Sequence, residues 1–239
     1  MFPPYIIANW KMNPKSEDEA KRLIRDTLPA IKREKARVIF LAPFVWLSSL
    51  NKVSEENPGL FDIGAQNSFW KESGAYTGEI SPIMLKNSGC SYVLVGHSER
   101  ELYLNEDKKM IKEKLKTILA ADLIPIFCLH SDSQEDLKQD LNLFLESIDE
   151  KEINKIIYVY EPTGAISTQG GKTPSREEIS LFKKIFNEVL GEKISLIYGG
   201  SVNSDNVKSL TTEIGLNGAL VGAKSLDATE FSNIIHCFD

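Results

Sequence analysis

The sequence predicts a closed (β/α)8 barrel of eight parallel strands. Eight short runs rich in β-branched and aromatic residues alternate with longer amphipathic stretches. Apolar strands separated by helices favour parallel pairing, because parallel neighbours need a crossover connection. Eight such units in 239 residues give about 30 residues each, the size of one unit of a barrel. We therefore expect a single domain over residues 1–239.

The eight expected strands cover residues 5–10, 37–42, 61–65, 92–96, 124–129, 156–160, 195–198 and 218–221. Between them, apolar residues recur at helical spacing, which predicts surface helices with one buried stripe each. The clearest stripes run over residues 20–31, 110–119, 137–148 and 179–190. An open, doubly wound sheet is the alternative fold. Polar residues at many strand ends favour the barrel, because a barrel builds its site from all of its strand ends.

The composition is that of a soluble globular protein, with 42% hydrophobic and 26% charged residues. Acidic residues outnumber basic ones, 34 to 28, giving a net charge of −6. Nucleic acids and membrane surfaces are themselves negative, so neither is an expected partner. No 18-residue apolar run occurs that could span a membrane. An anionic substrate would need local positive charge.

The N-terminus has no basic region before an apolar stretch, so a secretory signal is not expected. The three cysteines form no C-x-x-C pair, which favours reduced thiols and a cytoplasmic location. No metal-ligand spacing is present, so we expect no metal. Residues 170–173 (GGKT) resemble the end of a nucleotide-binding loop, but Ile166 occupies the position where that loop requires glycine.

Candidate site residues lie at the ends of five of the expected strands. Polar ones are Asn9 and Lys11 at the end of the first, His97, Ser98 and Glu99 after the fourth, Glu161 after the sixth and Ser201 after the seventh; Gly222 and Ala223 follow the eighth. Because the carboxyl ends of barrel strands share one face, these side chains are expected to meet.

This set of groups favours one kind of chemistry. A carboxylate can remove a carbon-bound proton where a neighbouring carbonyl acidifies that carbon, and an imidazole or ammonium then stabilises the oxyanion. Backbone N–H groups of glycine turns suit a phosphate. In barrels the phosphate site follows strands seven and eight. The expected substrate is thus a small phosphorylated carbonyl compound.

Four segments carry a family resemblance, in order along the chain: residues 9–13 (NWKMN), 96–100 (GHSER), 160–162 (YEP) and 198–202 (YGGSV). Residues 65–67 (AQN) and 74–79 (GAYTGE) agree as well. The sequence resembles the triosephosphate isomerase family, whose fold is the TIM barrel. The resemblance implies interconversion of dihydroxyacetone phosphate and D-glyceraldehyde 3-phosphate without a cofactor, in glycolysis and gluconeogenesis.

The resemblance also implies roles for individual residues. Glu161 is the base that moves the proton between C1 and C2. His97 is the neutral electrophile at the enediolate oxygens, beside the positive end of the helix that begins near Ser98. Lys11 supplies the local cation, with Glu99 as a supporting carboxylate and Asn9 holding the substrate. The phosphate is bound by backbone N–H groups at Ser167, Ser201, Gly222 and Ala223.

Two loops are expected to be functional by the same resemblance. Residues 162–172 form a lid that excludes water, although Gly164 replaces the family's usual Trp, Ser167 replaces Gly, and two residues are added before Lys172. Residues 74–79 insert into a partner subunit, which implies a homodimer. Glu101 and residues 128–131 (CLHS) depart from the family pattern near the site, and Ala223 replaces its usual Gly.

Two other functions remain as alternatives. A phosphate-binding barrel could use Lys11 as a Schiff-base nucleophile, as an aldolase does, if its surroundings lowered the pKa of the amine. A non-catalytic metabolite-binding barrel is the second. It would be indicated by loss of the base or the electrophile, and both Glu161 and His97 are present.

Overall fold

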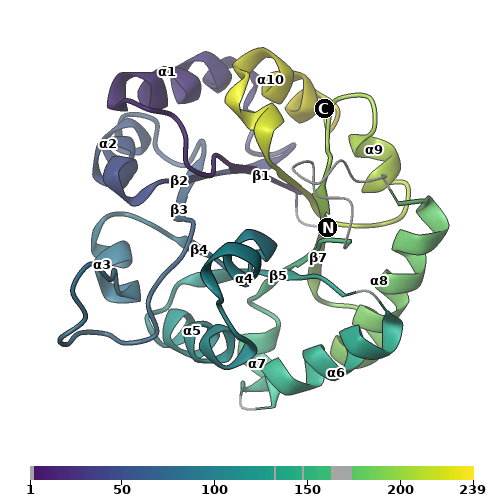
Figure 1. Cartoon of the computed structure of the whole chain (residues 1–239). Helices are drawn as coiled ribbons and strands as arrows, with labels where there is room; N and C mark the ends of the chain where they lie inside the picture. Colours follow the sequence, from purple (N-terminus) through teal and green to yellow (C-terminus); the bar gives the residue numbers. More distant parts are fainter. Residues whose placement is uncertain (1–2, 132, 147, 163–173) are drawn as a thin grey trace.

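The strands close into one parallel barrel in a computed structural model of the chain (Figure 1). The structure describes residues 3–131, 133–146, 148–162 and 174–239, so nearly all of the expected lid, with Gly164 and Ser167, lies outside the described residues. Each strand pairs with the next in the chain, and β1 pairs with β8. The strands are β1 (Tyr5–Asn9), β2 (Arg37–Ala42), β3 (Asp62–Ala65), β4 (Tyr92–Val95), β5 (Ile124–Leu129), β6 (Ile157–Tyr160), β7 (Ser195–Gly200) and β8 (Gly218–Val221). The predicted fold is confirmed.

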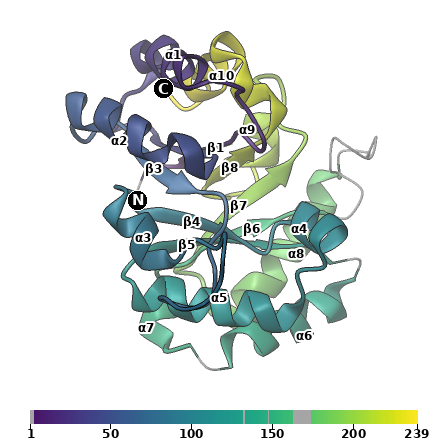
Figure 2. The ribbon, with the colours of Figure 1, turned by 60° about the vertical axis from the view of Figure 1, so that its left-hand side comes forward.

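Helices cover the outside of the strands in both views (Figures 1 and 2). They are α1 (Glu17–Thr27), α2 (Leu47–Glu56), α3 (Pro82–Asn87), α4 (Ser98–Leu104), α5 (Lys108–Ala120), α6 (Gln134–Leu145), α7 (Glu150–Ile153), α8 (Arg176–Leu190), α9 (Val207–Leu210) and α10 (Ala228–His236). Short 3-10 helices lie at η1 (Leu28–Ala30), η2 (Phe44–Trp46) and η4 (Ala223–Leu226). Among the helices of the described residues, none is long and apolar enough to cross a membrane.

Side-chain caps and apolar stripes explain the longer helices. Ser16, Ser133 and Ser175 accept hydrogen bonds from backbone N–H groups of the first turns of α1, α6 and α8, satisfying donors that lack a partner within the helix. The predicted stripes are buried in α5, α6 and α8. The first predicted stripe, over residues 20–31, extends past the end of α1 at Thr27. Pro29 lies in the next element, η1, because proline has no backbone N–H with which to continue the α-helix.

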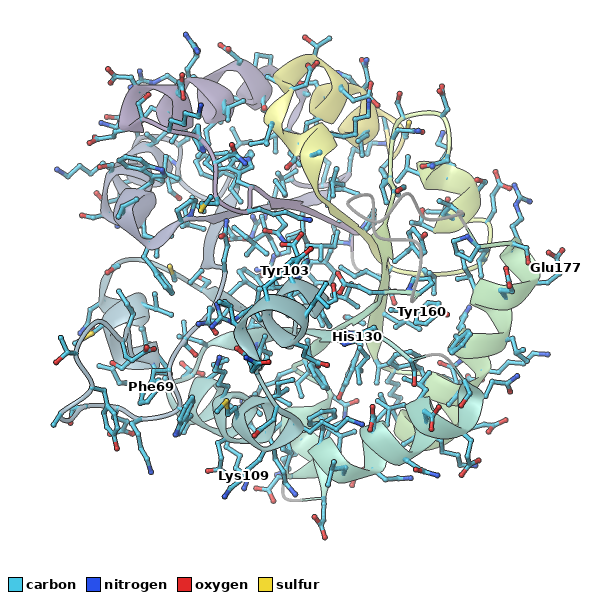
Figure 3. The ribbon with its side chains drawn as sticks, in the orientation of Figure 1. Phe69, Tyr103, Lys109, His130, Tyr160 and Glu177 are labelled. Atoms are coloured by element: carbon cyan, nitrogen blue, oxygen red, sulfur yellow. The ribbon has the colours of Figure 1, made fainter. Side chains whose placement is uncertain are left out.

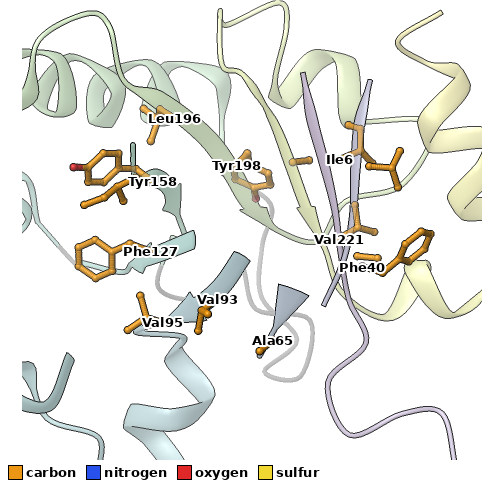
Figure 4. Packing of buried hydrophobic residues seen from close by; sticks show 14 of the residues in the cluster. Ile6, Phe40, Ala65, Val93, Val95, Phe127, Tyr158, Leu196, Tyr198 and Val221 are labelled. Carbon is orange, nitrogen blue, oxygen red and sulfur yellow. The ribbon is translucent and has the colours of Figure 1, made fainter. Parts of the chain in front are cut away.

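Side chains alternate along each strand between two apolar layers. The layer between strands and helices includes Ile6, Phe40, Val93, Phe127 and Tyr158 (Figure 4). The barrel interior is filled by a second set: Ile7, Ile39, Leu41, Tyr92, Leu94, Ile126, Cys128, Ile157, Val159, Ile197 and Leu220. The period of two residues decides which side chains can reach the mouth of the barrel.

Phe40 lies at the centre of an aromatic group on the outer face of β2. Its ring contacts Trp10, Phe61 and Phe231 at centroid distances of 5.6, 5.5 and 5.8 Å, and its side chain is 1% exposed. These contacts join β1, β2, the segment before β3, and α10.

We therefore expect Phe40→Ala to lower the free energy of unfolding by about 3–5 kcal/mol, because it leaves a cavity among three rings. Chemical denaturation monitored by circular dichroism measures the change. Leu143→Ala on α6, where the side chain is 43% exposed, serves as the control and should change stability by less than about 0.5 kcal/mol. Equal effects of the two substitutions would contradict the central role of Phe40.

Candidate active site

The side-chain alternation brings four positions to the mouth of the barrel. Asn9, Glu161, Gly199 and Gly222 each follow an inward-facing strand residue by two positions, so they lie on the inner side at the carboxyl ends. Strand register places them side by side, because Ala8 pairs with Val221 and Tyr160 pairs with Tyr198. Sequence positions more than 200 residues apart thus face one space.

That space is a cavity lined by Asn9, Lys11, His97, Ser98, Glu161, Gly199, Gly200, Leu220 and Gly222. Six of these residues were expected from the sequence. The other three, Gly199, Gly200 and Leu220, shape the cavity. Glu99 contacts Lys11 at the edge of the cavity and also lines a neighbouring groove.

Glu161 and His97 face each other inside the cavity. His97 Nε2 lies 3.5 Å from Glu161 Oε1, and the two residues are only 7% and 5% exposed. The backbone N–H of Glu161 donates to the carbonyl of Leu129 at 2.9 Å, which fixes Glu161 against β5. Among the described residues, no donor reaches Glu161 Oε2. The carboxylate therefore retains an oxygen that can accept a proton from a bound molecule.

His97 also begins α4, and this determines which nitrogen carries its proton. The backbone N–H of Glu99 donates to His97 Nδ1 at 3.2 Å. A backbone amide can only donate, so Nδ1 must present its lone pair. In the neutral ring the proton is then on Nε2, which faces Glu161 and the cavity. This tautomer can donate a hydrogen bond to a developing oxyanion.

Cys128 is a site residue that the sequence reasoning did not assign. It points into the barrel from β5, next to the Glu161 carboxylate. Burial, together with the charge of Glu161 and a hydrogen bond to it, raises the pKa of the Cys128 thiol well above its usual range. Cys128 therefore stays protonated next to the Glu161 carboxylate. The alternation of side chains along β5 was the signal that could have placed Cys128 on the inner face, two residues after Ile126.

Gly199 is the second unassigned position, and its lack of a side chain makes room for the base. A Cβ placed there would lie 2.7 Å from Val159 Cγ1 and 2.9 Å from Glu161 Cγ. Both distances are shorter than side chains tolerate, so any larger residue must displace Glu161. In the sequence, Gly199 is only part of the segment 198–202 that carries the family resemblance, and no role was predicted for it.

Lys11 is held by contacts on both sides of its backbone. Its N–H donates to Asn9 Oδ1 at 3.1 Å, and its carbonyl accepts from Gln66 Nε2 at 2.9 Å. These bonds maintain a left-handed conformation (φ +52°), which is unfavourable for a non-glycine residue. The Nζ pairs closely with Glu99, and the aliphatic stem passes Gly222, where a Cβ would lie 3.7 Å from Lys11 Cε.

The expected phosphate-binding residues lie on the same side of the barrel mouth. Gly222 lines the cavity and precedes η4, which begins at Ala223. Ala223 is not among the described residues with positive φ, so alanine occupies this position without backbone strain. Ser201 directly follows β7, and its carbonyl accepts from Asn206 Nδ2 at 2.9 Å. Ser167 lies outside the described residues.

A buried ionic network connects α4 to its neighbouring segments. Glu106 Oε2 accepts from Arg100 Nε at 2.6 Å and from Lys114 Nζ at 2.5 Å, and Lys114 also donates to Asn67. Burial lowers the pKa of Lys114, while Glu106 opposes that shift. The network links α4 and α5 to the segment after β3.

A buried carboxylate facing an imidazole, with a cation beside them at the carboxyl end of a (β/α)8 barrel, defines an enzyme that transfers protons. Comparison with known proteins identifies which one. The sequence pattern of the triosephosphate isomerase family matches residues 4–238. The chain belongs to the triosephosphate isomerase family.

Individual relatives agree over their full length. Triosephosphate isomerase of Caldanaerobacter subterraneus subsp. tengcongensis is 39% identical, over 99% of this chain and 100% of the relative. The enzyme of Dictyoglomus turgidum is 37% identical, over 96% and 97%. The crystal structure of triosephosphate isomerase from Bartonella henselae covers 99% of both chains with a TM-score of 0.83 and 28% identity. The resemblance read from the sequence is confirmed.

The contact between Glu99 and the His97 ring gives a direct prediction. We expect ¹⁵N resonances of the neutral His97 ring to show the proton on Nε2, with Nδ1 unprotonated, because Nδ1 accepts from the backbone. The chain has three histidines, and His97→Gln assigns the signal by its disappearance. A ring protonated on Nδ1 in its neutral form would contradict this geometry.

Proposed function

We propose that this chain interconverts dihydroxyacetone phosphate and D-glyceraldehyde 3-phosphate. The observation that carries the proposal is the buried Glu161 carboxylate facing His97 Nε2 at 3.5 Å in a cavity that also contains Lys11. Membership of the family and the names of its relatives support the same reaction.

The reaction follows from these groups alone. Glu161 accepts a proton from C1 of dihydroxyacetone phosphate, and the electron pair of the broken C–H bond forms the C1–C2 double bond. Negative charge moves to the carbonyl oxygen, where the His97 Nε2–H stabilises it by a hydrogen bond. A proton then passes from the C1 oxygen to the C2 oxygen, Glu161 returns its proton to C2, and the C1 oxygen becomes the aldehyde carbonyl. The enzyme is regenerated, so the proposal needs no cofactor and no metal.

The substrate's phosphate is proposed to bind beside η4. The N–H groups at the start of a short helix lack partners within it, and Gly222 and Ala223 lie at the start of η4. Ser201 and Ser167 are the further proposed donors. Lys11 supplies positive charge close to Gly222 in a chain whose net charge is −6, and Asn9 fixes its backbone. Glu99 and Ser98 support Lys11 and His97.

The pairing of Lys11 with Glu99 disfavours the Schiff-base alternative. A nucleophilic amine must be free to attack the substrate carbonyl, and the Lys11 Nζ is paired with the Glu99 carboxylate. Borohydride treatment in the presence of dihydroxyacetone phosphate distinguishes the two reactions, because only an imine is trapped. The non-catalytic alternative is disfavoured because the base and the electrophile are in contact.

The proposed base gives the sharpest test. Glu161→Gln should lower kcat by about 10²–10⁴-fold with little change in KM, because the amide cannot accept the proton yet keeps the shape of the side chain. A coupled assay of triose phosphate interconversion measures both constants. Glu177→Gln, on the surface of α8 (Figure 3), is the matched control and should leave kcat unchanged. Near-normal turnover of the Glu161 variant would refute the proposed role.

We also propose a homodimer that forms through residues 74–79. This segment reaches outward between β3 and α3 (Figure 1), and Tyr76 at its tip is 45% exposed. Near the cavity lies an apolar groove of about 510 Å³ lined by Met12, Phe44, Val45, Tyr103 and Leu104, among others. Met12 is 93% exposed and Val45 is 72% exposed. Exposed apolar groups of this extent support an interface.

Tyr76→Glu should therefore shift the chain from dimer to monomer and reduce activity, because it replaces an exposed ring of the proposed interface by a charged group. Sedimentation velocity across a concentration series measures the assembly. Glu72→Gln changes an exposed residue of the same loop and should leave the assembly intact. A monomeric wild-type chain would overturn the proposed interface.

We also propose, from the sequence, a single domain over residues 1–239 and a cytoplasmic location. The pairing of β1 with β8 supports the single domain.

A further inference from the structure

A second histidine lies close to the catalytic pair but outside the cavity. His130 directly follows β5, and its Nε2 contacts Glu101 Oε2 on α4 at 2.9 Å. Figure 3 shows His130 beside α4. The pair borders a separate cavity of about 240 Å³ between β5, α5 and α6. His130 Nδ1 is buried, and among the described residues no group forms a hydrogen bond with it.

The His130–Glu101 pair joins the two segments that carry the base and the electrophile. On one side, Leu129, the neighbour of His130, accepts the backbone hydrogen bond of Glu161. On the other side, Glu101 lies four residues after His97, which caps the same helix. Four residues are about one helical turn, so the pair connects the first turn of α4, which His97 caps, to the end of β5.

The charges around His130 are mostly negative. Glu101 faces it from α4, Asp140 from α6, and Glu161 from the end of β6. Asp136 on α6 and Lys108 on α5 line the same cavity, and Lys108 pairs with Asp140 at 2.5 Å. Burial lowers the pKa of His130, but the hydrogen bond and charge of Glu101, with Glu161 and Asp140, raise it above its usual range.

On the basis of the proposed function, we propose that His130 is a positioning residue for the isomerisation. Its ion pair with Glu101 holds α4 against the end of β5 at the separation where His97 Nε2 meets the Glu161 carboxylate. His130 touches neither the substrate nor the reacting atoms.

The sign of the pH effect follows from the titration of His130. Below the ordinary histidine pKa of 6.5, the pair is ionised and both its positioning and its stabilising effect are complete. As the pH rises through the raised pKa of His130, the positive charge is lost and the ion pair becomes a hydrogen bond from a neutral imidazole to the Glu101 carboxylate. We therefore expect kcat and stability to decline on the alkaline side.

Three variants separate positioning from simple packing. His130→Ala removes the pair and should lower kcat by about 10- to 100-fold, the size expected for misplaced reacting groups, with KM within about twofold of wild type. His130→Gln keeps a side-chain N–H for Glu101 but has no proton to lose in this pH range. It should keep kcat above that of His130→Ala, at the value that the wild type reaches on the alkaline side, and abolish the alkaline decline. Glu101→Gln should shift the decline to lower pH.

His236→Gln is the matched control. His236 Nδ1 pairs with Asp239 Oδ2 at 3.0 Å, far along the chain at the end of α10, so its loss should leave kcat and the pH profile unchanged. An activity-independent readout is the His97 ring resonance, which should move as His130 titrates in the wild type and stay fixed in His130→Gln.

Each outcome decides the question. The inference is overturned if His130→Ala has wild-type kcat, if the alkaline decline persists in His130→Gln, or if the His97 resonance ignores the titration of His130. A wild-type chain that binds inorganic phosphate but does not interconvert the triose phosphates would overturn the proposed function, and this inference with it. A wild-type chain that is active while its variants match the control would overturn this inference alone.

Discussion

The two-residue alternation of side chains in a closed parallel barrel is the constraint on which the rest of the molecule depends. Once Ile7, Val159 and Leu220 point inward to fill the interior, Asn9, Glu161 and Gly222 must point into the mouth. No local preference of these polar residues is needed. The apolar layers position the site, so packing and catalysis are linked through the register of neighbouring strands.

The proposed chemistry depends on tertiary contacts that complete each functional group. The base is anchored by a carbonyl of the preceding strand and given room by a glycine of the following one. The imidazole receives its tautomer from the first turn of its own helix. The lysine is held by an amide from β1 and another from the segment after β3. A buried carboxylate is unfavourable unless polar groups lie close to it, and His97 Nε2 lies 3.5 Å from Glu161 Oε1.

Local pattern was sufficient for much of this. Strand positions could be predicted because β-branched runs and helical stripes have different periods, and bounds such as 124–129 match the observed β5. Glu161, His97 and Lys11 were found because each follows a strand. The roles of Cys128 and Gly199 were missed, because each depends on a neighbour from another strand. The His130–Glu101 contact joins positions 29 residues apart, and nothing local distinguishes it from two solvated charges.

At position 11, the left-handed backbone conformation favours glycine for stability, whereas the proposed activity requires lysine. Glycine would adopt φ +52° without steric strain, yet it would remove the ammonium that we propose neutralises the substrate. Selecting variants for thermal stability alone would therefore favour glycine at position 11 and remove the proposed cation. Stabilising this barrel by replacing residues with unfavourable conformations should therefore spare position 11, where we propose that the side chain is needed for activity.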